Sequence, residues 1–418
     1  MKLKGPNDFD LAGKRVILRV AYDVPLKKHG SGFVVTDDTR IRTSIKTLRF
    51  LLRKKCRVII VTWLGRPGGK IVPDMRLDPV ARCLSALLKK QVKKLDAIIG
   101  PVVDTELSKM KPGDVVMLEN VRFSPWEEHH DMRLADELAK CADVVVFDAF
   151  AQSHRDYPST SGLLARLPAV CGYDMLKEVE TLGQLTGKPA SPFIVILGGA
   201  KISDKIDLIK HLIHKADAIL IGGALSHNFL KARGIKIAAS LVEGQTLELK
   251  KERKRLFTIA EEIMKEVGTS HVNLGPGLNI PKLVLPLVLV AAQSSEKSKR
   301  IEVIELAGKT QLPWNWMYMD IGPQTCALYG RIIKKAKTIF WNGPLGYIEE
   351  KAFAQGSIAI AKAIAESKGR SIVGGGDTEA FLRTYRLRSK FDYVSTGGGA
   401  VLELLSGKEL PVLKYLKR

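Results

Sequence analysis

The sequence has few cysteines, no long apolar run and no apolar segment typical of a signal peptide at its start. Each of these features argues against one class of protein. Its five cysteines are scattered, without a Cys-x-x-Cys pair or a Cys/His cluster, which predicts reduced thiols and no zinc site. The longest apolar run, Leu283 to Ala292, is far shorter than the roughly 20 residues of a membrane span. The first residues, Met1 to Asp8, lack the apolar core of a signal peptide. We therefore expect a cytoplasmic protein without a membrane partner.

Acidic residues are scarce relative to basic ones, 44 against 66, so the net charge is +22. Such a charge attracts nucleic acid, anionic membranes or anionic metabolites. The basic clusters lack the interleaved aromatic residues of a single-strand binder, so we do not expect nucleic acid as a partner. A basic, solvated surface on a monomer that binds small molecules is the simpler interpretation.

Apolar, strand-like segments alternate with helical patterns along nearly the whole chain, which predicts an α/β fold with parallel sheets. A length of 418 residues is too great for one ordinary core. Two consecutive sets of strand–helix units therefore predict two doubly wound, Rossmann-like domains, at 1–172 and 189–403. The polar, helix-prone segment between them predicts a hinge helix at 173–188.

The expected elements can be named by their residue ranges. The strands are Arg15 to Val20, Arg57 to Val61, Val115 to Leu118, Val144 to Phe147, Phe193 to Leu197, Ala218 to Ile221, Glu302 to Ile304, Thr338 to Trp341, Ser371 to Val373 and Tyr393 to Val394. The helices include Ile45 to Leu52, Asp78 to Leu88, Asp204 to His214 and Lys351 to Ser367.

Two triple-glycine turns, at Gly374 to Gly376 and Gly397 to Gly399, each lie between a strand-like segment and a helical one. Glycine lets a ligand approach the backbone closely, and a helix N-terminus offers N–H groups and the positive end of a dipole to phosphate. Two such turns predict a protein that handles phosphates. A carboxylate beside phosphates, Asp377, favours Mg²⁺, and helix capping is an alternative role compatible with it.

A third turn, Gly198 to Lys205, follows a strand-like segment and is expected to open a helix. It is not a Walker A loop, because the sequence contains no G-x-x-x-x-G-K-[ST] motif. It places Lys201 and Lys205 one helical turn apart, which suits the phosphates of a nucleotide. A plain helix-capping turn is the alternative.

Four arginines follow strand-like segments in the first half of the chain, at strand-to-helix turns. A guanidinium group matches phosphate and carboxylate oxygens two at a time. Each arginine alone would fit a surface ion pair, but their shared placement predicts one site for a small polyanion. They are Arg40, Arg66, Arg122 and Arg155.

The order of these motifs resembles the phosphoglycerate kinase family over nearly the whole chain, from about Lys14 to Pro411. The segments that carry the resemblance are Leu64 to Pro67, Leu118 to Phe123, Asp148 to Phe150 with His154 and Arg155, Gly198 to Lys205, Asp320 to Pro323, Trp341 to Pro344, Gly374 to Thr378 and Ser395 to Gly399.

The resemblance implies a hinge-bending, ATP-dependent phosphotransferase of glycolysis whose acceptor is a carboxyl group. It would transfer phosphate reversibly between 1,3-bisphosphoglycerate and ADP, giving 3-phosphoglycerate and ATP. The N-terminal domain would bind the glycerate ligand, and the C-terminal domain would bind the Mg²⁺-nucleotide. The last residues, about 404–418, would pack back on the N-terminal domain.

The resemblance also implies a role for each matching residue. Catalysis would fall to Arg40, Lys201, Gly376 and Gly399. The glycerate ligand would contact Asp23, Arg40, Trp63, Arg66, Arg122 and Arg155. The nucleotide would contact Gly199, Lys201, Lys205, Gly222, Asn342, Glu349, Gly376, Asp377 and Thr378, and Asp377 would also hold Mg²⁺.

The chain departs from the family pattern around the expected glycerate site. Where the family has Arg-x-Asp-x-Asn, this chain has alanine at position 21 and aspartate at position 23. Asp23 could supply the carboxylate that Ala21 lacks if both lie on one strand face, because side chains alternate along a strand. Trp63 replaces a histidine and could narrow the pocket or form an aromatic wall. Two alternatives therefore remain: a kinase for another small carboxylate, and a nucleotide-binding relative without catalysis.

Overall fold

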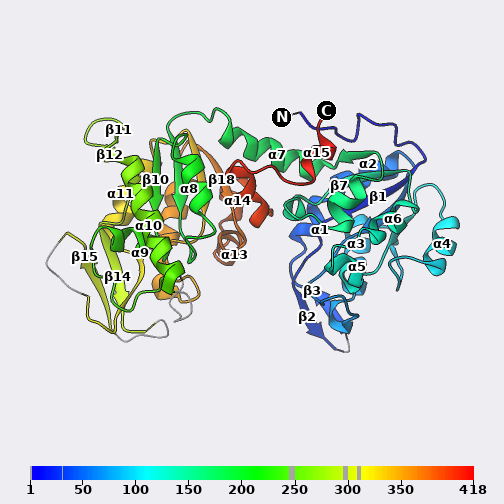
Figure 1. Cartoon of the computed structure of the whole chain (residues 1–418), viewed down its shortest axis with the longest axis horizontal. Coiled ribbons are helices and arrows are strands. Elements are labelled where there is room, and N and C mark those ends of the chain that lie inside the picture. Colours follow the sequence, from blue (N-terminus) through cyan, green and yellow to red (C-terminus); the bar gives the residue numbers. More distant parts are fainter. Residues whose placement is uncertain (1, 31, 244–249, 295–299, 308–311) are drawn as a thin grey trace. The chain divides into compact units, whose positions relative to one another are not determined.

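The computed structural model describes residues 2–30, 32–243, 250–294, 300–307 and 312–418, with the backbone alone over 250–257. The chain divides into two compact units (Figure 1). Unit 1 contains Met1–Thr181 and Glu409–Arg418, and unit 2 contains Leu182–Lys408. The transition between the units lies within helix α7 (Tyr173–Thr186), in the segment where the sequence predicts a hinge helix.

Unit 1 is built on a six-stranded sheet whose strands are all parallel, in the order β5-β6-β4-β1-β7-β8. The central strand β1 pairs with a neighbour on each side, so that Val16 lies opposite Val58 and Val144. The chain proceeds from β1 outward to β4 and then returns to β7, so the strand order reverses between β1 and β7. The strands are β1 (Arg15–Val20), β4 (Arg57–Val61), β5 (Lys93–Lys94), β6 (Val115–Met117), β7 (Val144–Asp148) and β8 (Ala169–Cys171).

Helices and short turns connect these strands, as parallel pairing requires. The helices of unit 1 besides α7 are α1 (Thr39–Thr43), α2 (Ile45–Arg53), α3 (Asp78–Leu88), α4 (Pro101–Ser108), α5 (Pro125–Glu128), α6 (Arg133–Ala139) and α15 (Leu413–Leu416). A hairpin of β2 (Leu26–His29) and β3 (Gly32–Val35) projects from the unit. The two ends of the chain meet in an antiparallel bridge between Leu3 and Lys417.

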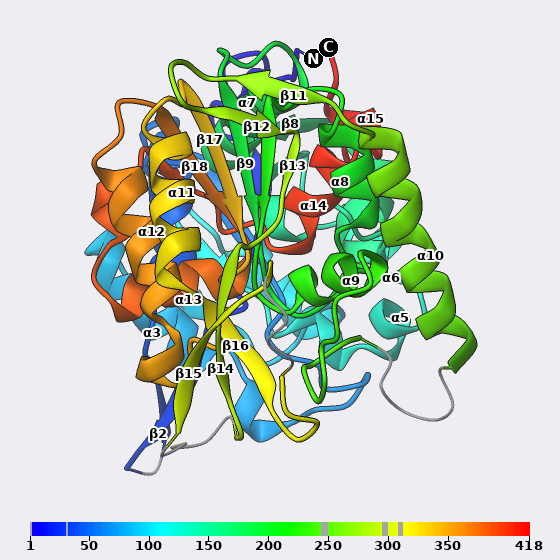
Figure 2. The same ribbon diagram turned by 90° about the vertical axis from the view of Figure 1, so that its left-hand side faces the viewer.

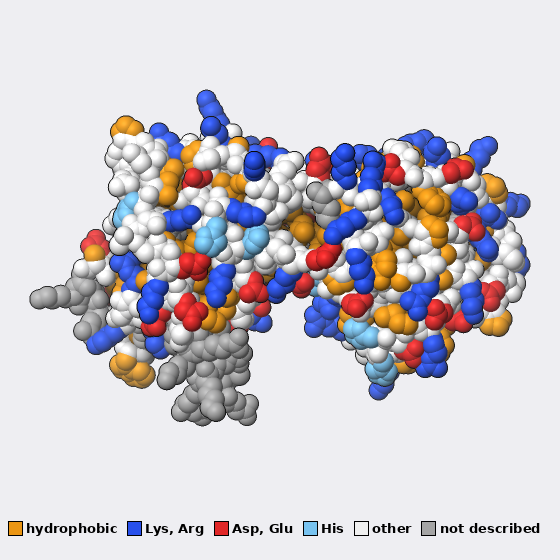
Figure 3. Space-filling view, turned by 45° about the horizontal axis from the view of Figure 1, so that its top comes forward, with side chains coloured by type: hydrophobic (Ala, Val, Ile, Leu, Met, Phe, Trp, Pro, Cys, Tyr) orange, Lys and Arg blue, Asp and Glu red, His pale blue; other side chains and the backbone are white. Residues whose placement is uncertain are grey.

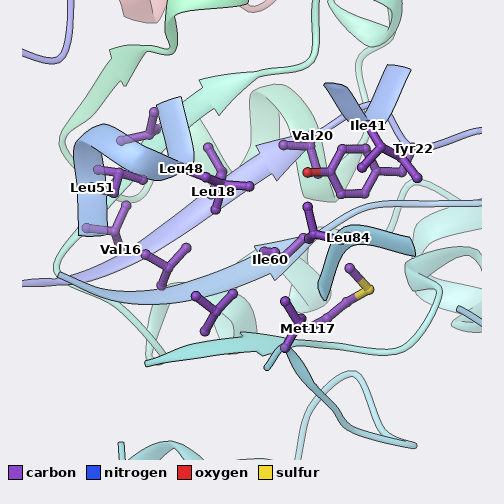
Figure 4. Close-up of a cluster of buried hydrophobic side chains, with 14 of the residues drawn as sticks. Val16, Leu18, Val20, Tyr22, Ile41, Leu48, Leu51, Ile60, Leu84 and Met117 are labelled. Carbon is purple, nitrogen blue, oxygen red and sulfur yellow. The ribbon is translucent and has the colours of Figure 1, made fainter. Parts of the chain in front are cut away.

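One core layer of unit 1 lies between the sheet and helices α1 to α3 (Figure 4). Alternate residues of β1, Val16, Leu18 and Val20, face this layer because successive side chains of a strand point to opposite sides. Leu48 of α2 and Leu84 of α3 pack against them, and both are completely buried. The amphipathic pattern of these helices thus positions the strand ends that carry the candidate site.

Unit 2 repeats this plan with another six-stranded parallel sheet, in the order β13-β10-β9-β17-β18-β19. Figure 2 shows α11, α12 and α13 on one side of these strands and α8, α9 and α10 on the other. The strands are β9 (Phe193–Leu197), β10 (Ala218–Ile221), β13 (Leu283–Val284), β17 (Thr338–Asn342), β18 (Arg370–Gly374) and β19 (Tyr393–Val394). The helices are α8 (Ile206–Leu212), α9 (Leu225–Ala232), α10 (Lys250–Val267), α11 (Pro323–Ile333), α12 (Gln355–Ala365), α13 (Gly376–Thr384) and α14 (Gly399–Leu405).

Unit 2 also contains antiparallel strands, which the sequence pattern did not predict. A three-stranded sheet places β14 (Val288–Ala292) between β15 (Ile301–Glu305) and β16 (Met317–Ile321). The segment Glu302 to Ile304, expected in a parallel sheet, belongs to this sheet instead. A hairpin pairs β11 (His271–Asn273) with β12 (Asn279–Pro281). The two doubly wound, Rossmann-like sheets are confirmed.

Several predicted boundaries are corrected by the structure. The helix expected from Asp204 begins at Ile206, so the turn before it is longer than predicted. The helix expected over Lys351 to Ser367 is a 3-10 turn, Lys351–Phe353, followed by α12. Strand β1 ends at Val20, so Ala21 and Asp23 lie beyond it, and the expectation that they share a strand face is wrong.

No helix among the described residues is long and apolar enough to cross a membrane. The basic side chains are distributed over the face of both units seen in Figure 3, with acidic side chains between them.

The packing of this core predicts that a cavity made at a buried residue of β4 lowers the stability of the protein strongly. Ile60 is completely buried between sheet and helices, so Ile60→Ala should lower the free energy of unfolding by about 2–5 kcal/mol. Ile71, of which 63% is exposed, gives the matched control, because Ile71→Ala should stay within about 0.5 kcal/mol. Denaturant titration of the three proteins measures both changes. Equal costs would contradict the placement of the core.

Candidate active site

In unit 2 the strand order reverses between β9 and β17, and the turns after these two strands contact each other through their backbones. The N–H of Gly199 donates to the Pro344 carbonyl at 2.7 Å. A Cβ atom at Gly198 would lie 2.1 Å from that oxygen, so no other residue fits there without displacing a turn. A reversal of strand order in a parallel sheet is the usual place for a ligand crevice.

The glycine turn after β18 is joined to the same place. The Thr378 hydroxyl accepts a hydrogen bond from the Gly343 N–H at 2.7 Å, and the Asn342 amide donates to the Gly374 carbonyl at 2.9 Å. Both side chains are buried, so they position the turns. The Thr378 hydroxyl uses only a lone pair in this contact and therefore keeps its proton for a second hydrogen bond.

Helix α13 presents its N-terminus at this turn. Its first backbone bond runs from the Glu379 N–H to the Gly375 carbonyl, so the N–H groups of Gly376 and Asp377 precede it. Gly376 and Asp377 are exposed, and a Cβ at Gly376 would meet open space. The arrangement suits an anion. Gly399 is the exposed first residue of the seven-residue helix α14.

The two predicted lysines have different surroundings. Lys201 is exposed in the turn after β9, whereas Lys205 is buried just before α8. Burial lowers the pKa of Lys205, and the carboxylates of Asp204 and Asp377 oppose this shift. Lys201 also acts on the same ammonium group, in the direction of a lower pKa. The charges of Lys201 and Asp377 thus both act on the Lys205 ammonium group, although the turn between the lysines is not helical.

A cavity of about 740 Å³ opens beside these turns. Of the predicted nucleotide residues, Gly199, Asp377 and Glu349 line it, and Gly222 lies behind its wall, against Leu345. Most of the lining is apolar and comes from residues that sequence motifs did not reveal: Leu241, Leu289, Met317, Met319, Leu345, Ile348 and Phe381. The double glycine at 222–223, directly after β10, is the one local signal of this wall in the sequence.

Asp320 lines the cavity and joins strand β16 to helix α12. Its carboxylate accepts hydrogen bonds from the N–H groups of Ile321, at 2.8 Å, and Gly356, at 2.7 Å. Gly356 is the second residue of α12, so the carboxylate caps this helix at the positive end of its dipole. Burial nevertheless raises the pKa of Asp320 to about 7, because the charged form loses its hydration.

In unit 1, the peptide groups of Gly65, in the turn after β4, are held from two sides. Its N–H donates to Asp23 Oδ1 at 2.9 Å, and its carbonyl accepts from Arg122 Nη1 at 2.7 Å. Arg40 Nη1 donates to the Asp23 carbonyl at 2.8 Å. The structure thus brings together Asp23, Arg40 and Arg122. One oxygen of Asp23 is already committed to the backbone.

Arg66 and Arg155 differ from the other two arginines. Within the described residues, neither guanidinium group makes a hydrogen bond or ion pair. Arg66 is exposed and Arg155 is half-buried. Both are available to a ligand, whereas Arg122 is buried and lies 3.3 Å from Glu128.

Trp63 is packed into the protein, with 2% of its surface exposed. The guanidinium groups of Arg19 and Arg122 lie over its rings, 4.7 and 4.3 Å from the ring centroid, and Tyr157 contacts it edge-on at 5.5 Å. Cations favour the electron-rich face of an indole. In this structure Trp63 therefore supports Arg122 and presents little surface of its own to a ligand.

The described parts of the chain contain no group of three or more His, Cys, Asp or Glu side chains that could hold a metal ion. A dedicated protein cage for a cation is therefore absent from these parts. Mg²⁺ is commonly held by one or two carboxylates together with phosphate oxygens, and the exposed Asp377 beside the cavity fits that arrangement.

Asp320 gives a pH-dependent prediction. Its pKa is about 7 in the folded chain and 3.8 in its ordinary state, so its stabilising effect is complete below about pH 4 and is lost as the pH rises to about 7. Between pH 5 and 8 the free energy of unfolding should fall by about 2–3 kcal/mol more in the parent than in Asp320→Asn. Denaturant titrations of both proteins across this range measure the difference, and parallel pH profiles would contradict the assignment.

Three comparisons with known proteins agree. The family model described as phosphoglycerate kinase matches residues 7–408. Phosphoglycerate kinase of Moorella thermoacetica is 42% identical over 97% of this chain and 96% of its own length, and that of Dictyoglomus turgidum is 46% identical over 98% and 97%.

Solved structures give the same result. The phosphoglycerate kinase structures from Coxiella burnetii and Pyrococcus horikoshii are 36% and 32% identical to this chain, with TM-scores of 0.81 and 0.82. Each alignment covers 99% of this chain and 98% of the other. The chain belongs to the phosphoglycerate kinase family and is a kinase of glycolysis.

Proposed function

We propose that the chain catalyses reversible phosphoryl transfer from the acyl phosphate of 1,3-bisphosphoglycerate to ADP, with the 3-phosphoglycerate carboxylate as acceptor in reverse. Unit 2 binds the nucleotide and unit 1 binds the glycerate ligand. The observation that carries the proposal is an apolar cavity of nucleotide size that Gly199 and Asp377 line, with the Lys205 ammonium group close to Gly199, in a member of this family.

In unit 2 the apolar cavity takes the base, and Glu349 at its rim reaches the ribose. The phosphates lie along the turns after β9 and β18, where Lys201, Lys205 and the N–H groups of Gly376 and Asp377 receive their charge. Asp377 would hold Mg²⁺, which would neutralise phosphate charge when bound. The Thr378 hydroxyl donates its remaining proton to a phosphate oxygen, and Asn342 holds the turn in place.

In unit 1 the available guanidinium groups of Arg66 and Arg155 bind the 3-phosphate. Arg122 donates a hydrogen bond to the Gly65 carbonyl and adds positive charge to the site. Arg40 lies on the other side of Asp23 and is assigned to the moving phosphoryl group together with Lys201. The basic residues thus act as a group, since Coulomb attraction to a polyanion does not require every cation to touch it.

The reaction itself requires alignment and positive charge. The transferred phosphoryl group carries negative charge on its three outer oxygens, and the acyl oxygen is a good leaving group. Lys201 and Arg40 stabilise that charge, and no covalent intermediate or strong general base is needed. Direct transfer requires the two ligands to meet with water excluded, and we assign this movement to bending at α7.

Lys201→Ala tests the transfer step. The substitution removes a cation from the developing charge, so kcat should fall by two or more orders of magnitude while binding of 3-phosphoglycerate changes little. Lys334→Ala, which removes an exposed lysine after α11, is the matched control and should keep parental kcat. A coupled assay with ATP and 3-phosphoglycerate measures both. Near-normal turnover of Lys201→Ala would remove Lys201 from the mechanism.

The departures at positions 21, 23 and 63 predict weakened recognition of the glycerate. Ala21 offers no acceptor, Asp23 Oδ1 is used by Gly65, and Trp63 is buried, so the KM for 3-phosphoglycerate should be raised and that for ATP ordinary. A triple variant that restores the family pattern, Ala21→Asp with Asp23→Asn and Trp63→His, should lower the KM for 3-phosphoglycerate roughly 5- to 150-fold and leave the KM for ATP unchanged.

Asp23→Asn alone serves as a partial control, because an amide oxygen can still accept the Gly65 N–H. If the parent already has a low KM and the triple variant loses activity, the pocket has been rebuilt around the same substrate. If the parent is inert with 3-phosphoglycerate and the variant gains activity, the natural acceptor is another carboxylate and the proposed substrate is wrong.

A further inference from the structure

The cavity of unit 2 is lined mainly by apolar side chains, but three buried polar side chains also line it: Asp320, which caps α12, and His227 and Tyr318. His227 comes from α9 and Tyr318 from β16, and their ring centroids lie 6.0 Å apart. A few polar groups in an apolar pocket usually fix the orientation of a ligand. No role in phosphate transfer accounts for these two residues, because the phosphate-binding turns lie elsewhere along the wall.

The hydrogen bonding of His227 fixes which of its nitrogens carries the proton. Nδ1 lies 2.7 Å from the Leu241 carbonyl oxygen, and a carbonyl can only accept, so Nδ1 carries the hydrogen. Burial lowers the pKa of His227 to about 4, so the ring is neutral at physiological pH. Nε2 of a neutral imidazole protonated at Nδ1 is a hydrogen-bond acceptor.

The remaining polar atoms of these two cavity-lining side chains have no protein partner among the described residues. Within the described residues, His227 Nε2 and the Tyr318 hydroxyl make no hydrogen bond. Neither atom is among the fully buried polar atoms that lack a partner, so each retains accessible surface, and both residues line the cavity. A lone acceptor and a hydroxyl therefore point to a ligand that brings a donor and an acceptor side by side.

We propose that His227 is a specificity-determining residue: its Nε2 accepts a hydrogen bond from the 6-amino group of an adenine base, and the Tyr318 hydroxyl donates to the neighbouring ring nitrogen. The inference rests on the proposed function, which places the base in this cavity. A 6-oxo purine would present an oxygen lone pair to the lone pair of Nε2, and this repulsion selects against it. A purine without a 6-substituent would leave Nε2 unpaired.

The discriminating experiment compares two ligands that differ only in the amino group, ADP and purine riboside 5′-diphosphate. Calorimetric titration of the full chain should show that the parent binds ADP about 5- to 10-fold more tightly, the value of one neutral hydrogen bond. In His227→Phe this ratio should fall to about 1, because the acceptor is lost while an apolar ring remains. In Tyr318→Phe the ratio should stay above 1, while both ligands bind more weakly.

The chain offers a matched control in His271, whose Nδ1 also lies 2.7 Å from a carbonyl oxygen, that of Thr269, but which is exposed and outside the cavity. His271→Phe should retain the parental ratio. A ratio near 1 in the parent, or an unchanged ratio in His227→Phe, overturns the inference. The parental ratio decides the matter even if His227→Phe does not fold. Failure of the parent to bind either diphosphate would instead overturn the proposed function.

Discussion

The candidate site of unit 2 depends on one contact, the backbone-to-backbone approach of the turns that follow β9 and β17. These strands are parallel neighbours at the reversal of the strand order, so the turns that follow them lie side by side at one edge of the sheet. The hydrogen bond from the Gly199 N–H to the Pro344 carbonyl joins the two turns, and a side chain at Gly198 would collide with the same carbonyl. The Gly343 N–H also donates to the Thr378 hydroxyl, which links the first turn of α13 to this contact.

Unit 1 solves a similar problem by different means. Its turn after β4 is held by side chains, with Asp23 on the N–H of Gly65 and Arg122 on its carbonyl. The two arginines therefore differ in role. Arg122 is buried and fixes the turn, whereas Arg66 is exposed and extends from the turn into solvent. This division explains why four arginines at strand ends need not be four equivalent ligands.

The parallel sheets could be predicted from the sequence because buried strands such as Arg57–Val61 and Phe193–Leu197 are short, continuous apolar runs. The glycine turns after the strands could be located because glycine triplets and paired lysines are local signals, and phosphate binding at these turns stays a prediction. The antiparallel strand β15 could not, because its identity depends on pairing with β14 and not on its own pattern. The apolar cavity was missed for a related reason: residues such as Leu241, Met319 and Phe381 look like ordinary core residues and become a site only when the fold leaves space between them.

The tryptophan at position 63 is best understood from the charges around it. Arg19 is completely buried, and burial lowers its pKa to about 9, while Glu127 opposes that shift and Arg122 adds to it. Burial also raises the pKa of Glu127, which disfavours its negative charge. This carboxyl group therefore neutralises the two guanidinium groups less completely than a solvated carboxylate would. A histidine at this position would add a third group that can become positive beside two cations. An indole cannot become positive, and its electron-rich face attracts both guanidinium groups, so Trp63 stabilises the charged cluster of Arg19 and Arg122.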